Sequence, residues 1–264
     1  MNKEELYKLG LAEHYAHRGY YKKPEIPENS LSAFRRAIEY GLGSEFDVHL
    51  IADGSLVIFH DEYLLRETGA PGEIEDYDLE ELRKLRLEGS DEPIPTFDEV
   101  LDLYEDTGIP IMIELKPNRG NHKELAEAVA KRLDTYKGPF AVESFDPRAV
   151  LAMRRLRPHF TRGQLAQDYF RKPEGLPLHQ IVPLTICAFN ILTKPQFIAY
   201  KYEHRNNKAL RKLTASKDML EVLWTIATVR GYEETMKKGI IPIFEKIEPE
   251  EIGLVKTDPK TSGK

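Results

Sequence analysis

Short apolar runs alternate with longer amphipathic stretches along the chain, and this alternation predicts repeated units of one strand followed by one helix. Residues 110–116 (PIMIELK) form one such apolar run, and residues 122–136 follow with apolar positions at helical spacing. The same patterns predict further strands at residues 14–17, 45–50, 56–59, 139–144, 160–166, 197–201, 221–227 and 240–246. They predict further helices at residues 29–42, 78–87, 96–106, 147–157, 205–213 and 231–238.

The number of strand–helix units is about eight, which is the number at which a parallel sheet closes into a barrel. A chain of 264 residues also has the length of one such barrel. We therefore predict an α/β fold with a single (β/α)₈ barrel domain over residues 1–256 and a polar, disordered tail at residues 257–264. Residues 173–195 contain four prolines and are expected to form an insertion or a βα loop with short helices.

Composition and charge narrow the classes of function. Hydrophobic residues make up 41% of the chain, which supplies apolar side chains for a large core. The net charge of −6 argues against general binding to nucleic acid or to a membrane surface, so an anionic substrate needs local positive charge. The single cysteine, Cys187, excludes an intramolecular disulfide, and its apolar neighbours favour a buried structural thiol over a nucleophile.

The location of the protein is predicted from two absences in the sequence. The first ten residues are charged and lack the apolar stretch of a secretory signal. No segment approaches the ~20 continuous apolar residues of a membrane span. We therefore expect a cytoplasmic protein without stable membrane insertion.

Three carboxylates fall within predicted strands, in the region where a barrel enzyme has its active site. Glu45 and Asp47 lie two residues apart and project from one face of the same strand, and Glu114 lies near the end of the strand at residues 110–116. Carboxylates that converge in a packed region repel one another and take up protons unless a cation neutralises them. Because all-oxygen ligation suits Mg²⁺ or Ca²⁺, we predict one divalent cation; solvated acids or salt-bridge partners are the alternative.

Two histidines and two cationic side chains lie at the ends of the same predicted strands. His17 and His60 are candidates for the general acid and base, because histidine titrates nearest to neutral pH. Arg18 and Lys116 supply the positive charge that an acidic protein needs to hold a phosphate, although each can equally form an ion pair with the carboxylates. Together these groups suit the hydrolysis of a phosphodiester.

Seven motifs resemble those of the glycerophosphodiester phosphodiesterase family, in the family's order and at approximately its spacing. They are HRG at residues 17–19, PENS at 27–30, EFDV at 45–48, DG at 53–54, VIFHD at 57–61, PTFDE at 95–99 and ELK at 114–116. The resemblance is strong over residues 13–117 and continues more weakly through residues 144–145 and 224–225. It implies a TIM barrel with a small insertion after the second strand. It also implies hydrolysis of glycerophosphodiesters to glycerol 3-phosphate and an alcohol, with one divalent cation.

The resemblance also assigns roles to individual residues. It implies metal ligation by Glu45, Asp47 and Glu114, acid–base catalysis by His17 and His60, and phosphate contacts by Arg18 and Lys116. Glu28 and Asn29 match the family's Glu-Asn pair near the site, where Asn29 can hydrogen-bond substrate or cap the following helix. Trp224 is expected at a strand end, either as an apolar wall of the pocket or packed in the core.

One segment departs from the family pattern. The family commonly ends its barrel with Gly-Ile-Ile-Thr-Asp-x-Pro, whereas residues 239–245 read GIIPIFE. We expect this change to make the rim around Trp224 and Phe244 more apolar and to influence substrate choice there.

Three functions are compatible with these residues. The first is a glycerophosphodiester phosphodiesterase that takes a small-molecule substrate. The second is a lysophospholipase D-type phosphodiesterase, in which the apolar last strand and residues 173–195 form a wall for an acyl chain. The third is a non-catalytic barrel that binds phosphate metabolites, against which the pair of histidines speaks. The sequence does not indicate the oligomeric state.

Overall fold

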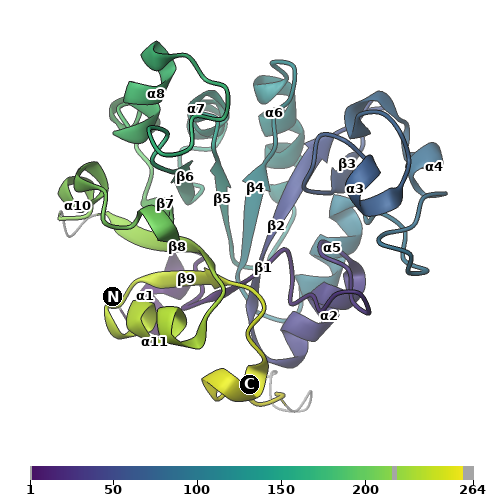
Figure 1. Cartoon of the computed structure of the whole chain (residues 1–264). Helices are drawn as coiled ribbons and strands as arrows, with labels where there is room; N and C mark the ends of the chain where they lie inside the picture. Colours follow the sequence, from purple (N-terminus) through teal and green to yellow (C-terminus); the bar gives the residue numbers. More distant parts are fainter. Residues whose placement is uncertain (1, 216–218, 258–264) are drawn as a thin grey trace.

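Eight parallel strands close into a barrel in the computed structural model, which describes residues 2–215 and 219–257 (Figure 1). Strand β1 pairs with both β2 and β9, and these two pairings close the cylinder. The barrel strands are β1 (Tyr15–His17), β2 (Gly43–Leu50), β4 (Ile111–Leu115), β5 (Phe140–Ser144), β6 (Arg162–Ala166), β7 (Phe197–Lys201), β8 (Leu220–Ile226) and β9 (Ile241–Phe244). The predicted TIM barrel is confirmed.

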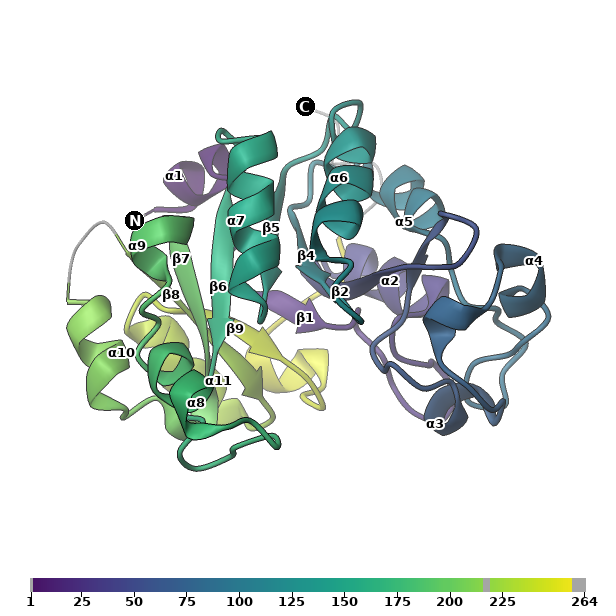
Figure 2. The same ribbon diagram turned by 90° about the horizontal axis from the view of Figure 1, so that it is seen from above.

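Helices surround the barrel, as Figures 1 and 2 show from two sides. The α-helices are α1 (Lys3–Lys8), α2 (Leu31–Glu39), α3 (Leu65–Thr68), α4 (Leu79–Leu82), α5 (Phe97–Tyr104), α6 (His122–Leu133), α7 (Pro147–Leu156), α8 (Leu178–Thr185), α9 (Asn190–Thr193), α10 (Lys208–Leu213) and α11 (Val229–Lys237). Short 3₁₀ turns are η1 (Ile74–Asp76), η2 (Tyr202–His204) and η3 (Pro249–Ile252).

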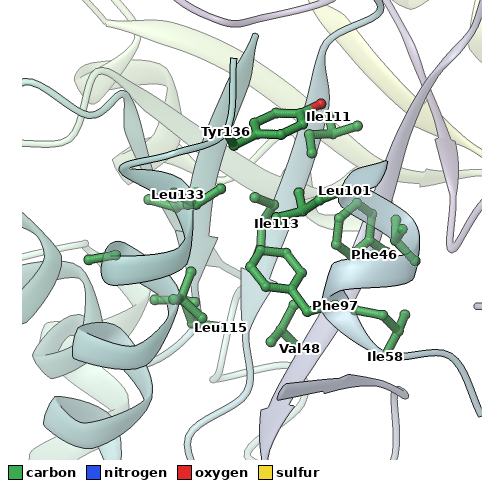
Figure 3. Close-up of a cluster of buried hydrophobic side chains, with 14 of the residues drawn as sticks. Phe46, Val48, Ile58, Phe97, Leu101, Ile111, Ile113, Leu115, Leu133 and Tyr136 are labelled. Carbon is green, nitrogen blue, oxygen red and sulfur yellow. The ribbon is translucent and has the colours of Figure 1, made fainter. Parts of the chain in front are cut away.

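Alternation along the strands separates an outer core from the barrel interior. On β2, Phe46 and Val48 face outward and pack with Phe97 and Leu101 of α5 (Figure 3). The alternate residues Glu45 and Asp47 therefore face inward. This pleat is what delivers polar side chains to the inside of the barrel.

Apolar side chains fill the lower part of the barrel and close its N-terminal end. Tyr15 and Met112 belong to the same buried cluster as Leu6 of α1 and Leu11 after it. Helix α1 was not predicted from the sequence, although Asn2 and Glu5 form a reciprocal capping box at its start.

The insertion after β2 carries its own small core. Strand β3 (Leu56–Ile58) runs antiparallel to β2, and residues 62–95 continue through α3, η1 and α4. Ile51, Phe59, Leu64 and Leu87 are buried together in this unit. The predicted insertion is confirmed, and it lies on the other side of the barrel from α8 (Figures 1 and 2).

The C-terminal tail and the absence of a membrane span were also predicted from the sequence. Within the predicted tail at residues 257–264, all but Thr257 lie outside the described residues, and the amide of Thr257 donates to the carbonyl of Glu39 at 2.7 Å. The single-domain boundary at residue 256 stays a prediction. Among the helices of residues 2–215 and 219–257, none has both the length and the apolar character needed to cross a bilayer.

Candidate active site

The inward side chains at the C-terminal end of the barrel form an acidic centre. Glu45 and Asp47 of β2 and Glu114 of β4 are buried, and their carboxylate oxygens lie within 4.8 Å of one another. The parallel register explains the convergence, because Asp47 and Glu114 are direct neighbours across the β2–β4 pair. The structure therefore brings together the three acids that the sequence singled out.

Burial and mutual repulsion determine the protonation of this centre. Burial raises the pKa of Glu45 well above its usual range, and the neighbouring charge of Asp47 adds to the rise. Burial likewise raises the pKa of Glu114 to about 7, with Lys116 opposing the rise and Asp47 adding to it. Burial also acts to raise the pKa of Asp47, but the charges of His60 and Lys116 outweigh it and lower this pKa. Near neutral pH, Glu45 therefore holds a proton and Glu114 is partly protonated, whereas Asp47 is ionised, and a cation would displace the protons of the two glutamates.

The donor set fits a hard divalent cation. All three side chains offer oxygen, the ligand atom that Mg²⁺ and Ca²⁺ prefer. In addition, Oδ1 of Asp47 is buried without a hydrogen-bond partner among the described residues. A buried carboxylate oxygen that accepts no hydrogen bond is unfavourable in a protein interior, and a bound cation would compensate for the missing bond.

His17 is oriented by a carboxylate on one side and faces the acidic centre with the other. Its Nδ1 lies 2.8 Å from Oε2 of Glu245, and its Nε2 lies 3.9 Å from Oε2 of Glu45. Burial, followed by the charge of Arg18, lowers the pKa of His17, while Glu245 acts to raise it. Tyr21 also donates to Glu245, at 2.7 Å. A neutral imidazole with Nδ1–H on Glu245 leaves Nε2 free to accept a proton.

His60 has a similar arrangement on the insertion side of the mouth. Its Nδ1 lies 2.6 Å from Oδ1 of Asp61, the next residue in the chain. Burial lowers the pKa of His60, against the opposing effects of Asp47 and Asp61. The guanidinium of Arg66 on α3 contacts Asp61 and also donates to Glu28 at 2.9 Å, so the insertion is tied to the site.

The two predicted phosphate contacts are paired with carboxylates. Arg18 Nη1 donates to Oε1 of Glu28 at 2.5 Å, and Arg18 Nε lies 3.7 Å from Oδ2 of Asp47. Lys116 Nζ lies 3.1 Å from Oε1 of Glu114 and 3.5 Å from Oδ1 of Asp47. The ion pairs that the sequence left open are therefore present, and both cations lie beside the acidic centre where a phosphate would sit.

Asn29 contacts the acidic centre and does not cap a helix. The cap of α2 is Ser30, whose side chain accepts from the amide of Ala33. The side-chain Nδ2 of Asn29 donates to Oδ2 of Asp47 at 2.9 Å, and the backbone N–H of Asn29 donates to the carbonyl of Arg18 at 2.8 Å. Arg18 (φ 52°) and Asn29 (φ 54°) both have left-handed backbones, a costly conformation that clusters at functional sites.

Trp224 lies at the mouth of the barrel, half-buried. Its Nε1 donates to the carbonyl of Ala199 at 3.1 Å. Its ring meets that of Phe145 edge-on, with centroids 5.3 Å apart and planes at 90°. Lys201 Nζ lies 5.7 Å from the centroid of the Trp224 ring. Trp224 and Phe145 therefore pack against each other and against the buried cluster that includes Leu165 and Val222, and the role of Trp224 as a wall of the pocket stays a prediction.

The prediction of an apolar rim at Phe244 is wrong. Phe244 is fully buried on the outer face of the barrel, where its ring packs edge-on with Tyr20 and Tyr232 at centroid distances of 5.8 and 5.1 Å. Strand alternation turns the next residue, Glu245, toward His17 instead. This end of β9 thus contributes a carboxylate to the site.

Two acids of the site were missed in the sequence. Glu245 is half-buried and lies near the end of the predicted strand at residues 240–246, and Glu143 is buried beside Glu114 in the β4–β5 register. Burial raises the pKa of Glu143 well above its usual range, and both of its carboxylate oxygens lack hydrogen-bond partners within the described part of the chain. The signal was available, because Glu143 and Phe145 follow the same two-residue alternation as Glu45 and Asp47.

Cys187 is buried, as predicted. Its side chain packs with the cluster that includes Tyr200 and Ala166. Burial raises the pKa of the thiol to about 12, so the thiolate is not populated near neutral pH. A nucleophilic role is therefore not supported.

Fold and site together define a TIM-barrel enzyme with an acidic centre of the cation-binding kind, flanked by two carboxylate-oriented histidines. Residues 17–228 match the glycerophosphoryl diester phosphodiesterase family, and the chain belongs to that family. It is accordingly a hydrolase of phosphodiesters, and the alternative of a non-catalytic barrel is set aside.

Named relatives agree with this placement. A glycerophosphodiester phosphodiesterase from Caldanaerobacter subterraneus is 35% identical over 187 residues, which are 67% of this chain and 76% of the relative. One from Bacillus altitudinis is 32% identical over 170 residues, 61% of this chain and 69% of the relative. Among solved structures, an Oleispira antarctica phosphodiesterase in complex with the product sn-glycerol-3-phosphate has a TM-score of 0.75 and 25% identity, covering 90% of this chain and 94% of that one.

Proposed function

We propose that the protein hydrolyses glycerophosphodiesters to glycerol 3-phosphate and an alcohol, with one divalent cation held by Glu45, Asp47 and Glu114. The convergence of the three carboxylate oxygens within 4.8 Å supports this ligand set. When bound, the cation supplies electrophilic stabilisation of negative charge on the phosphoryl oxygens. The donor set suits Mg²⁺ or Ca²⁺ equally.

The cationic side chains of the site bind the phosphate. Arg18 offers a planar fork of donors and Lys116 a point charge, and both lie beside Asp47. Asn29 holds Asp47 in place through the hydrogen bond to Oδ2. Glu28 in turn holds the Arg18 guanidinium toward the centre, so that its role is to position a phosphate contact. Trp224 borders the substrate as an apolar wall.

His17 and His60 move the protons of the reaction. One imidazole accepts the proton of the attacking oxygen, and the other donates a proton to the departing alcohol. The attacking oxygen is either a hydroxyl of the substrate's glycerol, which gives a cyclic phosphate that water then opens, or water itself. Trapping of a cyclic glycerol phosphate during a single turnover distinguishes these two courses.

The observation that carries the proposal is the pair of histidine–carboxylate contacts at one acidic centre. Each imidazole has Nδ1 within 2.8 Å of a carboxylate oxygen, Glu245 for His17 and Asp61 for His60. Such a contact fixes the ring and its tautomer and leaves Nε2 for proton transfer. Binding of a phosphate alone requires neither group.

The direct test is hydrolysis of glycerophosphocholine by the purified protein. We expect choline release in Mg²⁺ or Ca²⁺, its loss when the cation is removed with a chelator, and its return when the cation is added back. Binding of glycerophosphocholine with no hydrolysis in either Mg²⁺ or Ca²⁺ would refute the enzyme assignment. We also propose a cytoplasmic location, as predicted from the sequence, and a role in lipid and glycerol metabolism, which follows from the proposed substrate.

A further inference from the structure

A cavity of about 730 Å³ lies beside the mouth of the barrel, between the start of α7 and the segment that follows β6. This segment (residues 167–195) contains α8 and α9 and forms the lobe at the upper left of Figure 1. The volume is within the roughly 300–1,000 Å³ of small-molecule sites. The lining is mostly apolar and includes Phe145, Leu151, Tyr169, Leu176, Leu184 and Phe189.

The charged groups at the edge of the cavity are already paired. Arg148 Nη2 lies 2.7 Å from Oδ2 of Asp146, so this pair does not offer a free cation to a second phosphate. Apart from His179, Gln180 and Thr193, the remaining wall is aliphatic and aromatic, and this apolar part would gain most from contact with a hydrocarbon. The cavity is therefore suited to an apolar ligand.

The same segment has an unusual concentration of exposed apolar side chains. Of the eleven large hydrophobic residues exposed in the described parts of the chain, seven lie between residues 170 and 192. Scattered exposed apolar residues are normal, but a concentration of this kind marks contact with an apolar ligand or surface. The seven are Phe170, Leu178, Val182, Ile186, Phe189, Ile191 and Leu192.

Phe145 joins the cavity to the catalytic mouth. It follows Glu143 by two residues, lines the cavity, and meets Trp224 edge-on at 5.3 Å. A substrate with its phosphate at the acidic centre can therefore extend past Phe145 into the cavity.

We propose that this cavity binds the acyl chain of a monoacyl glycerophosphodiester, so that lysophospholipids are preferred over deacylated substrates. The proposal rests on the proposed function, because the same acidic centre performs the reaction. One water is consumed, the phosphorus–oxygen bond to the headgroup alcohol is broken, and that alcohol leaves with a proton. The other product is a monoacylglycerol phosphate.

The test compares glycerophosphocholine with hexanoyl, octanoyl and decanoyl lysophosphatidylcholine, each kept monomeric, by release of choline. Because each buried methylene contributes about 0.8 kcal/mol, kcat/KM should rise roughly two- to fourfold per methylene until the cavity is filled. Glycerophosphocholine, which has no acyl chain, is the reference.

Two leucines of α8 provide matched variants. Leu184 lines the cavity, whereas Leu178 is 65% exposed and does not line it. Leu184→Asp should remove most of the gain with chain length and leave glycerophosphocholine turnover within about twofold of wild type, because a buried charge opposes only the acyl chain. Leu178→Asp should leave both quantities unchanged. If Leu184→Asp does not fold, Leu184→Trp, which narrows the cavity, should also reduce the gain with chain length.

The outcomes separate this inference from the proposed function. Turnover of glycerophosphocholine with no dependence on chain length overturns the acyl-chain site alone. An equal loss in Leu178→Asp and Leu184→Asp also overturns it, because the exposed face rather than the cavity would then contact the chain. Failure to hydrolyse every substrate overturns the proposed function, and the acyl-chain site with it.

Discussion

At the scale of single residues, carboxylates set the chemistry of the two histidines. Glu245 contacts Nδ1 of His17 at 2.8 Å, and Asp61 contacts Nδ1 of His60 at 2.6 Å. Burial lowers the pKa of both imidazoles, and the carboxylates limit that lowering. Neither histidine would have the same proton affinity without its partner.

The contribution of Glu245 can be measured by its replacement with glutamine. Because the carboxylate raises the pKa of His17, Glu245→Gln should lower that pKa further. The limb of the kcat/KM–pH profile that belongs to His17 should move to lower pH by about one unit, while the other limb stays in place. Tyr21→Phe, which removes the other hydrogen bond to Glu245, is the control and should move the limb much less. If both limbs of the kcat/KM–pH profile of Glu245→Gln coincided with those of wild type, Glu245 would not control the pKa of His17.

At the scale of elements, ion pairs of Arg66 connect the insertion after β2 to the residues of the site. Arg66 of α3 contacts Glu28, Asp61 and Glu67. Glu67 is fully buried, and its Oε2 lacks a hydrogen-bond partner among the residues described. Burial, with the charge of Glu28, raises its pKa to about 9 against the opposing effect of Arg66.

This raised pKa makes the stability of the protein depend on pH. A proton stays on Glu67 in the folded state up to about pH 9, whereas the unfolded chain releases it near pH 4.5. Stability therefore falls as the pH rises between these values, and Glu67→Gln should remove that loss. We expect equal stability near pH 4.5 and a gain of about 1–3 kcal/mol at pH 8, measured by urea unfolding.

A control for this effect is available in the same insertion. Glu80→Gln removes an exposed acid on α4 that pairs with Lys84. It should leave stability unchanged at both pH values. If Glu67→Gln were no more stable than wild type at pH 8, the raised pKa of the Glu67 carboxyl in the folded protein would be disproved.

Elements with strong periodicity were predictable, and short ones were not. The strand predicted at residues 110–116 is observed as Ile111–Leu115, because a fully buried parallel strand forms a nearly continuous apolar run, interrupted here only by Glu114. Helices α1 and α3 have six and four residues, too few for an amphipathic period to show. Their positions depend on packing against the barrel floor and on Arg66, which no local pattern encodes.

At the scale of the whole molecule, barrel closure assembles the site from distant segments. The acids of β2 and β4 were predictable because two-residue spacing fixes the face of a strand. The pairing of Glu245 with His17 spans 228 positions and depends on β9 closing against β1. The error at Phe244 has the same origin, because the register of the last strand decides which of two adjacent residues faces inward. Composition alone cannot supply that register.

The cavity beside the mouth also belongs to this scale. Residues 173–195, within the segment at residues 167–195, were predicted as an insertion or a βα loop with short helices, and α8 and α9 are observed there. Its relation to Phe145 and Trp224 depends on how the segment folds back over α7, which the sequence does not specify.

The central claim is that cation binding and proton transfer are divided between two sets of residues. The measurement is turnover of glycerophosphocholine together with cation affinity by calorimetry, in His17→Ala, His60→Ala and Glu45→Gln. Each histidine variant should lose about 10²- to 10⁴-fold in kcat while binding the cation as wild type does, because neither imidazole belongs to the three-carboxylate group. Glu45→Gln should bind the cation more weakly. Near-normal turnover in either histidine variant, or unchanged cation affinity in Glu45→Gln, would contradict the account.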